Sequence, residues 1–88
     1  MVDQGISVRV YGRVQGVGFR YYVLSRAQEL GIRGWIKNEH DGSVSLEAEG
    51  ASLNVFLDYL RQGPPRARVD KFETHSIPLQ GYTGFSIR

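Results

Sequence analysis

The chain has 88 residues, of which 41% are hydrophobic and 23% charged, with a formal net charge of +2 and no cysteine. A chain of this length forms one domain, residues 1–88, around a single core. The lack of cysteine excludes disulfides and a thiolate nucleophile, and no apolar run approaches the roughly 18–20 residues that cross a bilayer, so we expect a cytoplasmic protein with no membrane partner.

The first half of the chain predicts a strand, a helix and a hairpin. Apolar residues alternate over Ile6–Tyr11, as in a strand with one buried face. They then recur at helical spacing from Phe19 to about Leu30, and Gly31 follows as a C-cap. The next two strands of the prediction are Gly34–Asn38 and Val44–Ala48, joined by the turn-forming sequence Glu39-His40-Asp41-Gly42.

The second half predicts another helix and two strands. Leucine and phenylalanine recur over Leu53–Leu60, with Ser52 as N-cap and Gly63-Pro64-Pro65 as the stop. An extended segment runs from Ala67 to about His75, and its alternation slips between Val69 and Phe72, which predicts a β-bulge. Phe85 and Ile87 indicate a short last strand.

The order β-α-β-β-α-β with an extra C-terminal strand is typical of an α+β, ferredoxin-like fold. Such a fold has one antiparallel sheet with two helices on one face. A right-handed crossover makes the first two strands parallel, with the third between them. The loop after the first strand and Asn38 at the end of the second should therefore face each other at one rim of the sheet.

That loop is the most informative segment of the sequence. Tyr11-Gly12-Arg13-Val14-Gln15-Gly16-Val17-Gly18-Phe19-Arg20 joins a strand to a helix that has an arginine in its first turn. Glycines let a ligand approach the main chain, and a helix N-terminus supplies free N–H donors. Arg20 adds a planar, two-pronged donor suited to phosphate. The segment therefore predicts an oxyanion or phosphate cradle.

Two plainer interpretations of these residues remain open. An isolated Gly-x-Gly is more often a tight connection than a site, and neither the dinucleotide fingerprint nor the Walker loop is met. The helix dipole, however, disfavours an arginine in the first turn unless an anion lies nearby. Asn38 could simply initiate the turn or cap its own backbone, whereas its place opposite the cradle favours the orientation of a water molecule.

We interpret the remaining polar residues as surface. His40 and His75 lack partners at metal-ligand spacing. The side chains of Asp41, Glu47 and Glu49 fall on hairpin positions that should face solvent and aid solubility. The basic residues form only one loose cluster, Arg61, Arg66, Arg68 and Lys71, which does not amount to a nucleic-acid footprint.

The sequence resembles the acylphosphatase family over nearly its whole length. The family motif Gly-x-Val-Gln-Gly-Val-x-Phe-Arg is met from Gly12 to Arg20. A second motif begins with Gly34-Trp35-Ile36-Lys37-Asn38 and continues through Gly42-x-Val44 to Gly50, with Ile36 where the family usually has a smaller residue. Two long motifs at this separation are highly specific.

The resemblance implies an enzyme that hydrolyses the carboxyl–phosphate bond of acyl phosphates without metal or cofactor. It implies catalytic roles for Arg20, which binds the phosphoryl group, and Asn38, which positions the nucleophilic water. The phosphate-binding loop would comprise Gln15, Gly16, Val17, Gly18, Phe19 and Arg20. We expect a monomer whose partners are an acyl phosphate substrate and inorganic phosphate, as product and inhibitor.

Two other classes remain as alternatives. A non-catalytic anion-binding or regulatory module could use the same fold, because fold alone does not fix function. An RNA-recognition domain shares the topology but stacks bases on aromatic residues of its central strands. The third predicted strand has no aromatic residue and two acids, Glu47 and Glu49, which argues against RNA.

Overall fold

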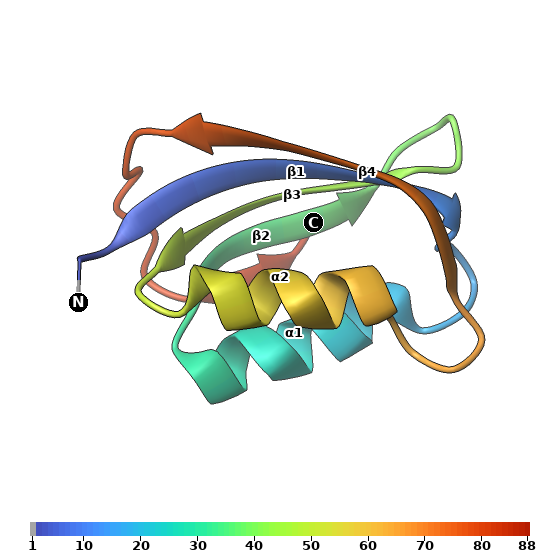
Figure 1. Cartoon of the computed structure of the whole chain (residues 1–88), viewed down its shortest axis with the longest axis horizontal. Coiled ribbons are helices and arrows are strands. Elements are labelled where there is room, and N and C mark those ends of the chain that lie inside the picture. Colours follow the sequence, from blue (N-terminus) through green and yellow to red (C-terminus); the bar gives the residue numbers. More distant parts are fainter. Residues whose placement is uncertain (1) are drawn as a thin grey trace.

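The computed structural model describes residues 2–88 as one five-stranded sheet with two helices packed on one face (Figure 1). Its elements, in chain order, are β1 (Gln4–Arg13), α1 (Phe19–Leu30), β2 (Arg33–Asn38), β3 (Val44–Gly50), α2 (Leu53–Gln62), β4 (Arg68–Ile77) and β5 (Phe85–Ile87). The predicted α+β, ferredoxin-like arrangement is confirmed. Among the described residues, no helix is long and apolar enough to cross a membrane.

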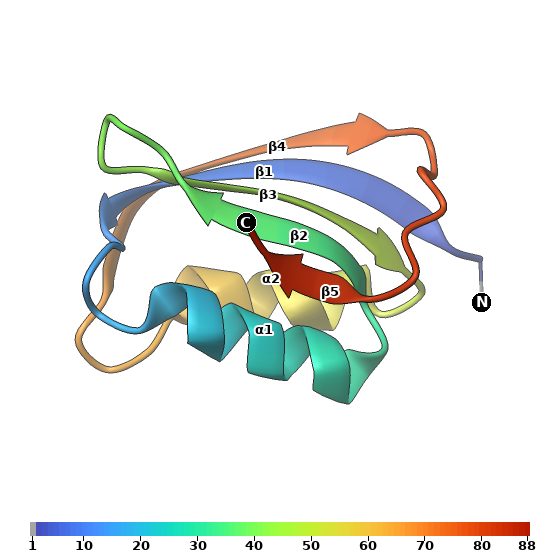
Figure 2. The same ribbon diagram turned by 180° about the vertical axis from the view of Figure 1, so that it is seen from behind.

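The sheet is mixed, so the prediction of a purely antiparallel sheet is wrong. The strand order is β4-β1-β3-β2-β5, and β5 runs parallel to β2 (Figure 2). The reason lies in the connection: the chain leaves β4 at the end of the sheet where β1 and β2 begin, because β4 is antiparallel to β1. A strand that starts at that end and joins β2 must run in the direction of β2.

One continuous core lies between the sheet and the helices. Alternate residues of β1 and β3 face it, among them Val8, Val10 and Leu46, each at most 2% exposed. From the helices, Phe19 and Phe56 are almost fully buried. Phe56 also meets Phe85 of β5 edge to face, with ring centroids 6.1 Å apart. The extra strand therefore contributes to the core as well as to the sheet.

The predicted bulge is present in β4 and fixes a glycine at the end of β1. Tyr11 pairs with Lys71, while the next residue, Gly12, pairs with Val69, so Asp70 is the extra residue. At Gly12, φ is +132°, and an added Cβ would lie 2.1 Å from the carbonyl oxygen of Arg68. Only glycine fits this approach, which sets the direction in which the chain leaves β1.

Ser52 occupies the N-cap position of α2, but its side chain makes no capping hydrogen bond. Only its backbone carbonyl takes part, accepting the N–H of Phe56 at 3.1 Å. The predicted start of the helix, with Ser52 as N-cap, is thus confirmed.

Candidate active site

The loop between β1 and α1 has a series of backbone N–H groups that find no backbone acceptor in the part of the chain that the structure describes. Gly16 and Gly18 have φ of 72° and 79°, and Gly18 is the N-cap of α1. The first helical hydrogen bond runs from the N–H of Tyr22 to the carbonyl of Gly18, at 3.0 Å. Within residues 2–88, no backbone carbonyl accepts a hydrogen bond from the N–H groups of residues 15–20. These donors are available to a ligand, as at other helix N-termini that bind anions.

Arg20 adds an uncompensated positive charge to these donors. Its side chain is half-buried in the first turn of α1, a turn that contains no acidic residue. In the described part of the chain, no carboxylate lies within ion-pair distance of its guanidinium. Because the helix dipole is also positive here, the electrostatic free energy of this end of α1 favours an anion.

The loop, Arg20 and Asn38 meet at one small hollow. It has a volume of about 130 Å³ and is lined by Val14, Gln15, Gly16, Gly18, Phe19, Arg20, Tyr21 and Asn38. This volume is well below the roughly 300–1,000 Å³ of sites that enclose drug-sized ligands, so it suits a group of few atoms. The structure thus brings Asn38 of β2 opposite the loop. Val17 points elsewhere: it is 8% exposed and belongs to the core.

The turn after Asn38 is held by its own polar groups. The N–H of Glu39 donates to the carbonyl of Ser43 at 2.8 Å, and the N–H of Gly42 donates to the carbonyl of Glu39 at 3.2 Å. The Asp41 carboxylate accepts the backbone N–H of Ser43 at 2.9 Å. Hydrogen bonds from Ser43 lower the pKa of Asp41, and the Ser45 hydroxyl, aided by Lys37, lowers the pKa of Glu39. Asp41 is thus exposed but structural.

Two residues of the site have roles that sequence reasoning missed. The side chain of Gln15 turns toward the hairpin, where its Nε2 donates to the carbonyls of Glu39 and Ser43 at 2.8 and 2.9 Å. Tyr21 lies at the edge of the hollow with 68% of its surface exposed. No sequence signal identifies the Gln15 contacts, because they depend on the three-dimensional approach of segments that are distant in the chain, whereas Tyr21 lines the hollow as the residue that directly follows Arg20.

The histidines lie apart from this site. His40 and His75 are both exposed, as predicted. Among residues 2–88, no group of three or more His, Cys, Asp or Glu side chains is placed to hold a metal ion.

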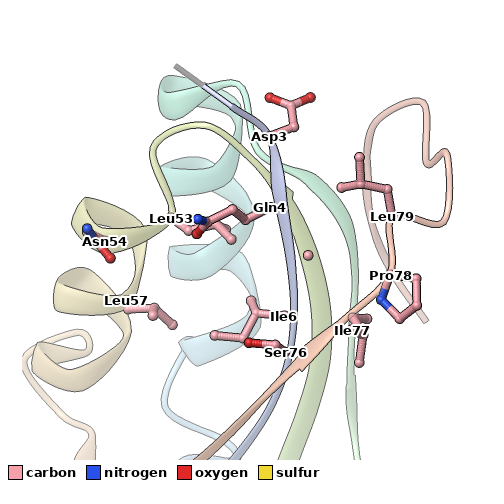
Figure 3. Close-up of a pocket in the computed structure, with 11 residues that line it drawn as sticks. Asp3, Gln4, Ile6, Leu53, Asn54, Leu57, Ser76, Ile77, Pro78 and Leu79 are labelled. Atoms are coloured by element: carbon pink, nitrogen blue, oxygen red, sulfur yellow. The ribbon is translucent and has the colours of Figure 1, made fainter.

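A second hollow, of about 440 Å³, lies beside the start of α2 (Figure 3). Its walls come from the beginning of β1, the end of β4 and α2, and include Ile6, Leu53 and Leu57. Asp3 is its one charged lining residue, and no basic residue lines it. It therefore has no complement for an anion, in contrast to the hollow beside Arg20.

Glu49 corrects the expectation that the acids of the hairpin are solubilising. It is 2% exposed, and its carboxylate accepts the backbone N–H groups of Gln80, Gly81 and Tyr82 at 2.7, 3.1 and 3.0 Å. Glu47 is half-buried and accepts the Tyr82 hydroxyl at 2.6 Å. The physical reason is that the segment before β5 crosses this part of the sheet and covers both carboxylates. We call this group of contacts the Glu49 clamp.

Comparison with known proteins agrees with the geometry. The family profile for acylphosphatases matches residues 6–87. The chain belongs to the acylphosphatase family. An acylphosphatase of Mannheimia succiniciproducens is 50% identical over 80% of this chain and 87% of its own length, and that of Photorhabdus laumondii is 43% identical over 100% and 99%. The crystal structure of the acylphosphatase from Bacillus subtilis superposes with a TM-score of 0.93 at 38% identity, covering 97% of this chain and 98% of that one.

Membership in the acylphosphatase family assigns hydrolysis of acyl phosphates to this chain. The family and activity predicted from the two motifs are confirmed, as is the fold predicted from the order of the elements. Family membership does not by itself assign roles to individual residues of this chain, so those roles are argued from the geometry of the hollow.

Proposed function

We propose that the hollow beside Arg20 is where this acylphosphatase hydrolyses its substrates. The observation that carries the proposal is Arg20, which is half-buried, has no carboxylate partner among the described residues, and lies beside a loop whose N–H groups have no backbone acceptor there. The amides of residues 15–20 and the Arg20 guanidinium bind the phosphoryl oxygens. Charge that builds up on these oxygens in the transition state is then stabilised by fixed donors.

Asn38 orients the attacking water. Its amide can donate to one oxygen and accept from a water at the same time, and it lies across the hollow from the loop. The water oxygen attacks phosphorus while the bond from phosphorus to the carboxylate oxygen breaks. The leaving carboxylate is a weak base, with a pKa near 4 in ordinary side chains, so its departure requires no general acid.

The chemistry of the lining fits acyl phosphates better than phosphate monoesters. None of the lining residues is a histidine or a carboxylic acid, so the site supplies positioning and electrostatics rather than proton transfer. An alkoxide leaving group would need a proton, whereas a carboxylate does not; p-nitrophenolate can leave unprotonated, but it is a stronger base than a carboxylate and therefore a poorer leaving group. We therefore expect turnover of benzoyl or acetyl phosphate and poor turnover of p-nitrophenyl phosphate.

The test separates binding from chemistry at Asn38. Asn38→Ala should lower kcat by roughly 10²–10³ and leave the Kd for inorganic phosphate nearly unchanged, because one transition-state hydrogen bond is lost while the loop is retained. Circular dichroism of the same preparation checks the fold. Equal losses in kcat and phosphate affinity would make Asn38 a binding residue, and an unchanged kcat would remove it from the mechanism. Phosphate binding by the wild-type protein without any turnover would favour the non-catalytic module.

Further parts of the proposal concern partners and conditions. Inorganic phosphate, as product, should inhibit competitively, and activity should survive EDTA, since the mechanism uses no metal. Sedimentation should give a monomer.

The cytoplasmic location expected from the sequence stays a prediction. The same holds for the expectation of no nucleic-acid partner, although Arg61, Arg68 and Lys71 each pair with a nearby acid.

A further inference from the structure

The Gln15 side chain joins the two halves of the proposed site. Its Nε2 donates to the carbonyl of Glu39 at 2.8 Å and to that of Ser43 at 2.9 Å, and both contacts are partly buried. Glu39 directly follows Asn38 in the chain. One residue of the loop thus contacts the backbone beside Asn38, although the two segments are 24 residues apart in sequence.

The two acceptors are the carbonyls that already close the turn. The oxygen of Glu39 also accepts the N–H of Gly42, and the oxygen of Ser43 also accepts the N–H of Glu39. A carbonyl oxygen has two lone pairs, so Gln15 supplies the second donor to each. The two N–H bonds of one amide nitrogen have fixed relative directions. Bonding to two oxygens therefore fixes both the distance and the orientation of the turn relative to the loop.

This arrangement separates the functions of the main chain and the side chain at Gln15. Both N–H bonds of the side-chain amide are used by the turn, and its remaining polar atom, Oε1, is an acceptor that cannot bind an anionic phosphoryl group. The side chain is therefore committed to the hairpin. The backbone N–H of the same residue has no backbone acceptor among the described residues and remains available to the ligand.

We propose that Gln15 is a positioning residue that acts through Asn38, holding the water-orienting amide at its working distance from the phosphoryl group. The proposal rests on the role of Asn38 proposed above. A misplacement of about 1 Å can cost about 10²-fold in rate. Loss of the Gln15 side-chain donors should therefore reduce turnover without weakening the loop's hold on phosphate.

A double-mutant cycle tests this coupling. Gln15→Met keeps the length of the side chain and removes both donors. It should lower kcat for benzoyl phosphate by about 10–100-fold and change the Ki of inorganic phosphate by less than about 3-fold. In the Asn38→Ala background, the same substitution should change kcat by less than about 3-fold, because the group that it positions is already absent.

Gln80→Met is the matched control. The Gln80 side chain also donates to a backbone carbonyl, that of Pro78 at 2.8 Å, but it does not line the hollow. The kcat of the Gln80→Met variant should equal that of the wild type. Gln15→Glu, in which a carboxylate faces two carbonyl oxygens, provides a second substitution should Gln15→Met fold poorly, and its kcat should fall at least as far.

The outcomes distinguish this proposal from the one on which it rests. If Gln15→Met lowers kcat by the same factor with and without Asn38, Gln15 does not act through Asn38 and the inference fails, while the role of Asn38 stands. A rise in phosphate Ki that matches the fall in kcat would make Gln15 part of the binding loop and would also overturn it. If Asn38→Ala alone leaves kcat unchanged, both proposals fail.

Discussion

Two segments of this chain present a group of backbone N–H donors at opposite ends of the sheet, one to a carboxylate of the chain itself and one, as we propose, to a phosphoryl group. The loop of residues 15–20 follows the end of β1, whereas Glu49 pairs with Gly5 near the start of β1. In the Glu49 clamp, three successive N–H groups meet a carboxylate of the chain itself, and Arg33 lies 3.7 Å from it. In the loop, by contrast, the N–H groups have no backbone acceptor and Arg20 has no carboxylate partner within residues 2–88.

The difference shows how one kind of contact serves stability in one place and binding in another. At the clamp, the anion is covalently part of the chain, so its hydrogen bonds form on folding and stabilise the native state. At the loop, the anion that we propose as its ligand comes from solution. The same donors then leave the free protein with uncompensated positive charge, and their stabilising effect appears only when a ligand binds.

The largest expected effect concerns Arg20. Arg20→Ala should lower kcat/KM by about 10³-fold, the scale seen when an arginine that stabilises transferred phosphoryl charge is removed. Its unfolding free energy in phosphate-free buffer should stay within about 1 kcal/mol of wild type or rise, because a cation leaves the positive end of α1. Kinetics and urea unfolding of one preparation measure both.

Arg20→Lys sharpens the same test. An ammonium cannot reproduce two parallel hydrogen bonds, so activity should remain low. Near-wild-type activity in this variant, or a stability loss of several kcal/mol in Arg20→Ala, would contradict the assignment of Arg20 to the open site.

Glu49→Gln should show the reverse of Arg20→Ala: a loss of stability with activity retained. The substitution replaces a carboxylate that accepts three backbone N–H groups. The NH₂ group of the new amide then faces the N–H donors of residues 80–82. We expect a loss of about 3 kcal/mol in unfolding free energy and an unchanged kcat per folded molecule. Glu47→Gln, which affects one hydrogen bond from Tyr82, is the control and should cost about 1 kcal/mol. Equal losses in the two variants would refute the special role of the clamp.

Inorganic phosphate should stabilise the protein only through the open loop. At a phosphate concentration of 100 times Kd, the unfolding free energy should rise by about 2.7 kcal/mol in the wild type and in Glu49→Gln. The rise should be absent in Arg20→Ala. Thermal unfolding at graded phosphate concentrations measures this, and sodium chloride of equal ionic strength controls for nonspecific salt effects. A phosphate effect that persists in Arg20→Ala would place the binding elsewhere.

The smallest effect is a pH dependence of the turn after Asn38. Asp41 and Glu39 have pKa values lowered from their ordinary 3.8 and 4.5. Their contribution to stability is therefore complete above those values and is lost as the pH falls through the lowered pKa of the folded state. The wild type should be more stable than Asp41→Asn at pH 6, and the difference should shrink below about pH 3.8. Denaturant unfolding across this range is the measurement, and a constant difference would contradict the contribution of the Asp41 charge.

The sequence was a good guide where one local rule decides the outcome. Alternation and helical spacing predicted the order of the elements, and the crossover rule predicted that Asn38 would lie opposite the loop, as the shared hollow confirms. The slip of alternation near Val69 correctly indicated the bulge at Asp70.

The sequence was a poor guide to features that depend on contact with a segment distant in the chain. Alternation places Glu49 on the sheet face away from the helices, but it cannot show that residues 80–82 cover that face. The direction of β5 depends on which end of the sheet the chain has reached, and the Gln15 contact depends on the packed position of the hairpin. These features arise from tertiary packing and have no signal in local residue patterns.

The place of β1 between β4 and β3 has a consequence for how fast the protein folds. β1 pairs with β3 on one side and β4 on the other, and its Tyr11 meets Glu73, 62 residues away in the chain. Contacts between residues so distant in sequence require the closure of long loops before they lower the free energy, so chains of this topology fold on slower timescales than helical bundles do. Since the proposed phosphate loop leaves directly from β1, we expect a refolding chain to gain this site only when these long-range pairings form.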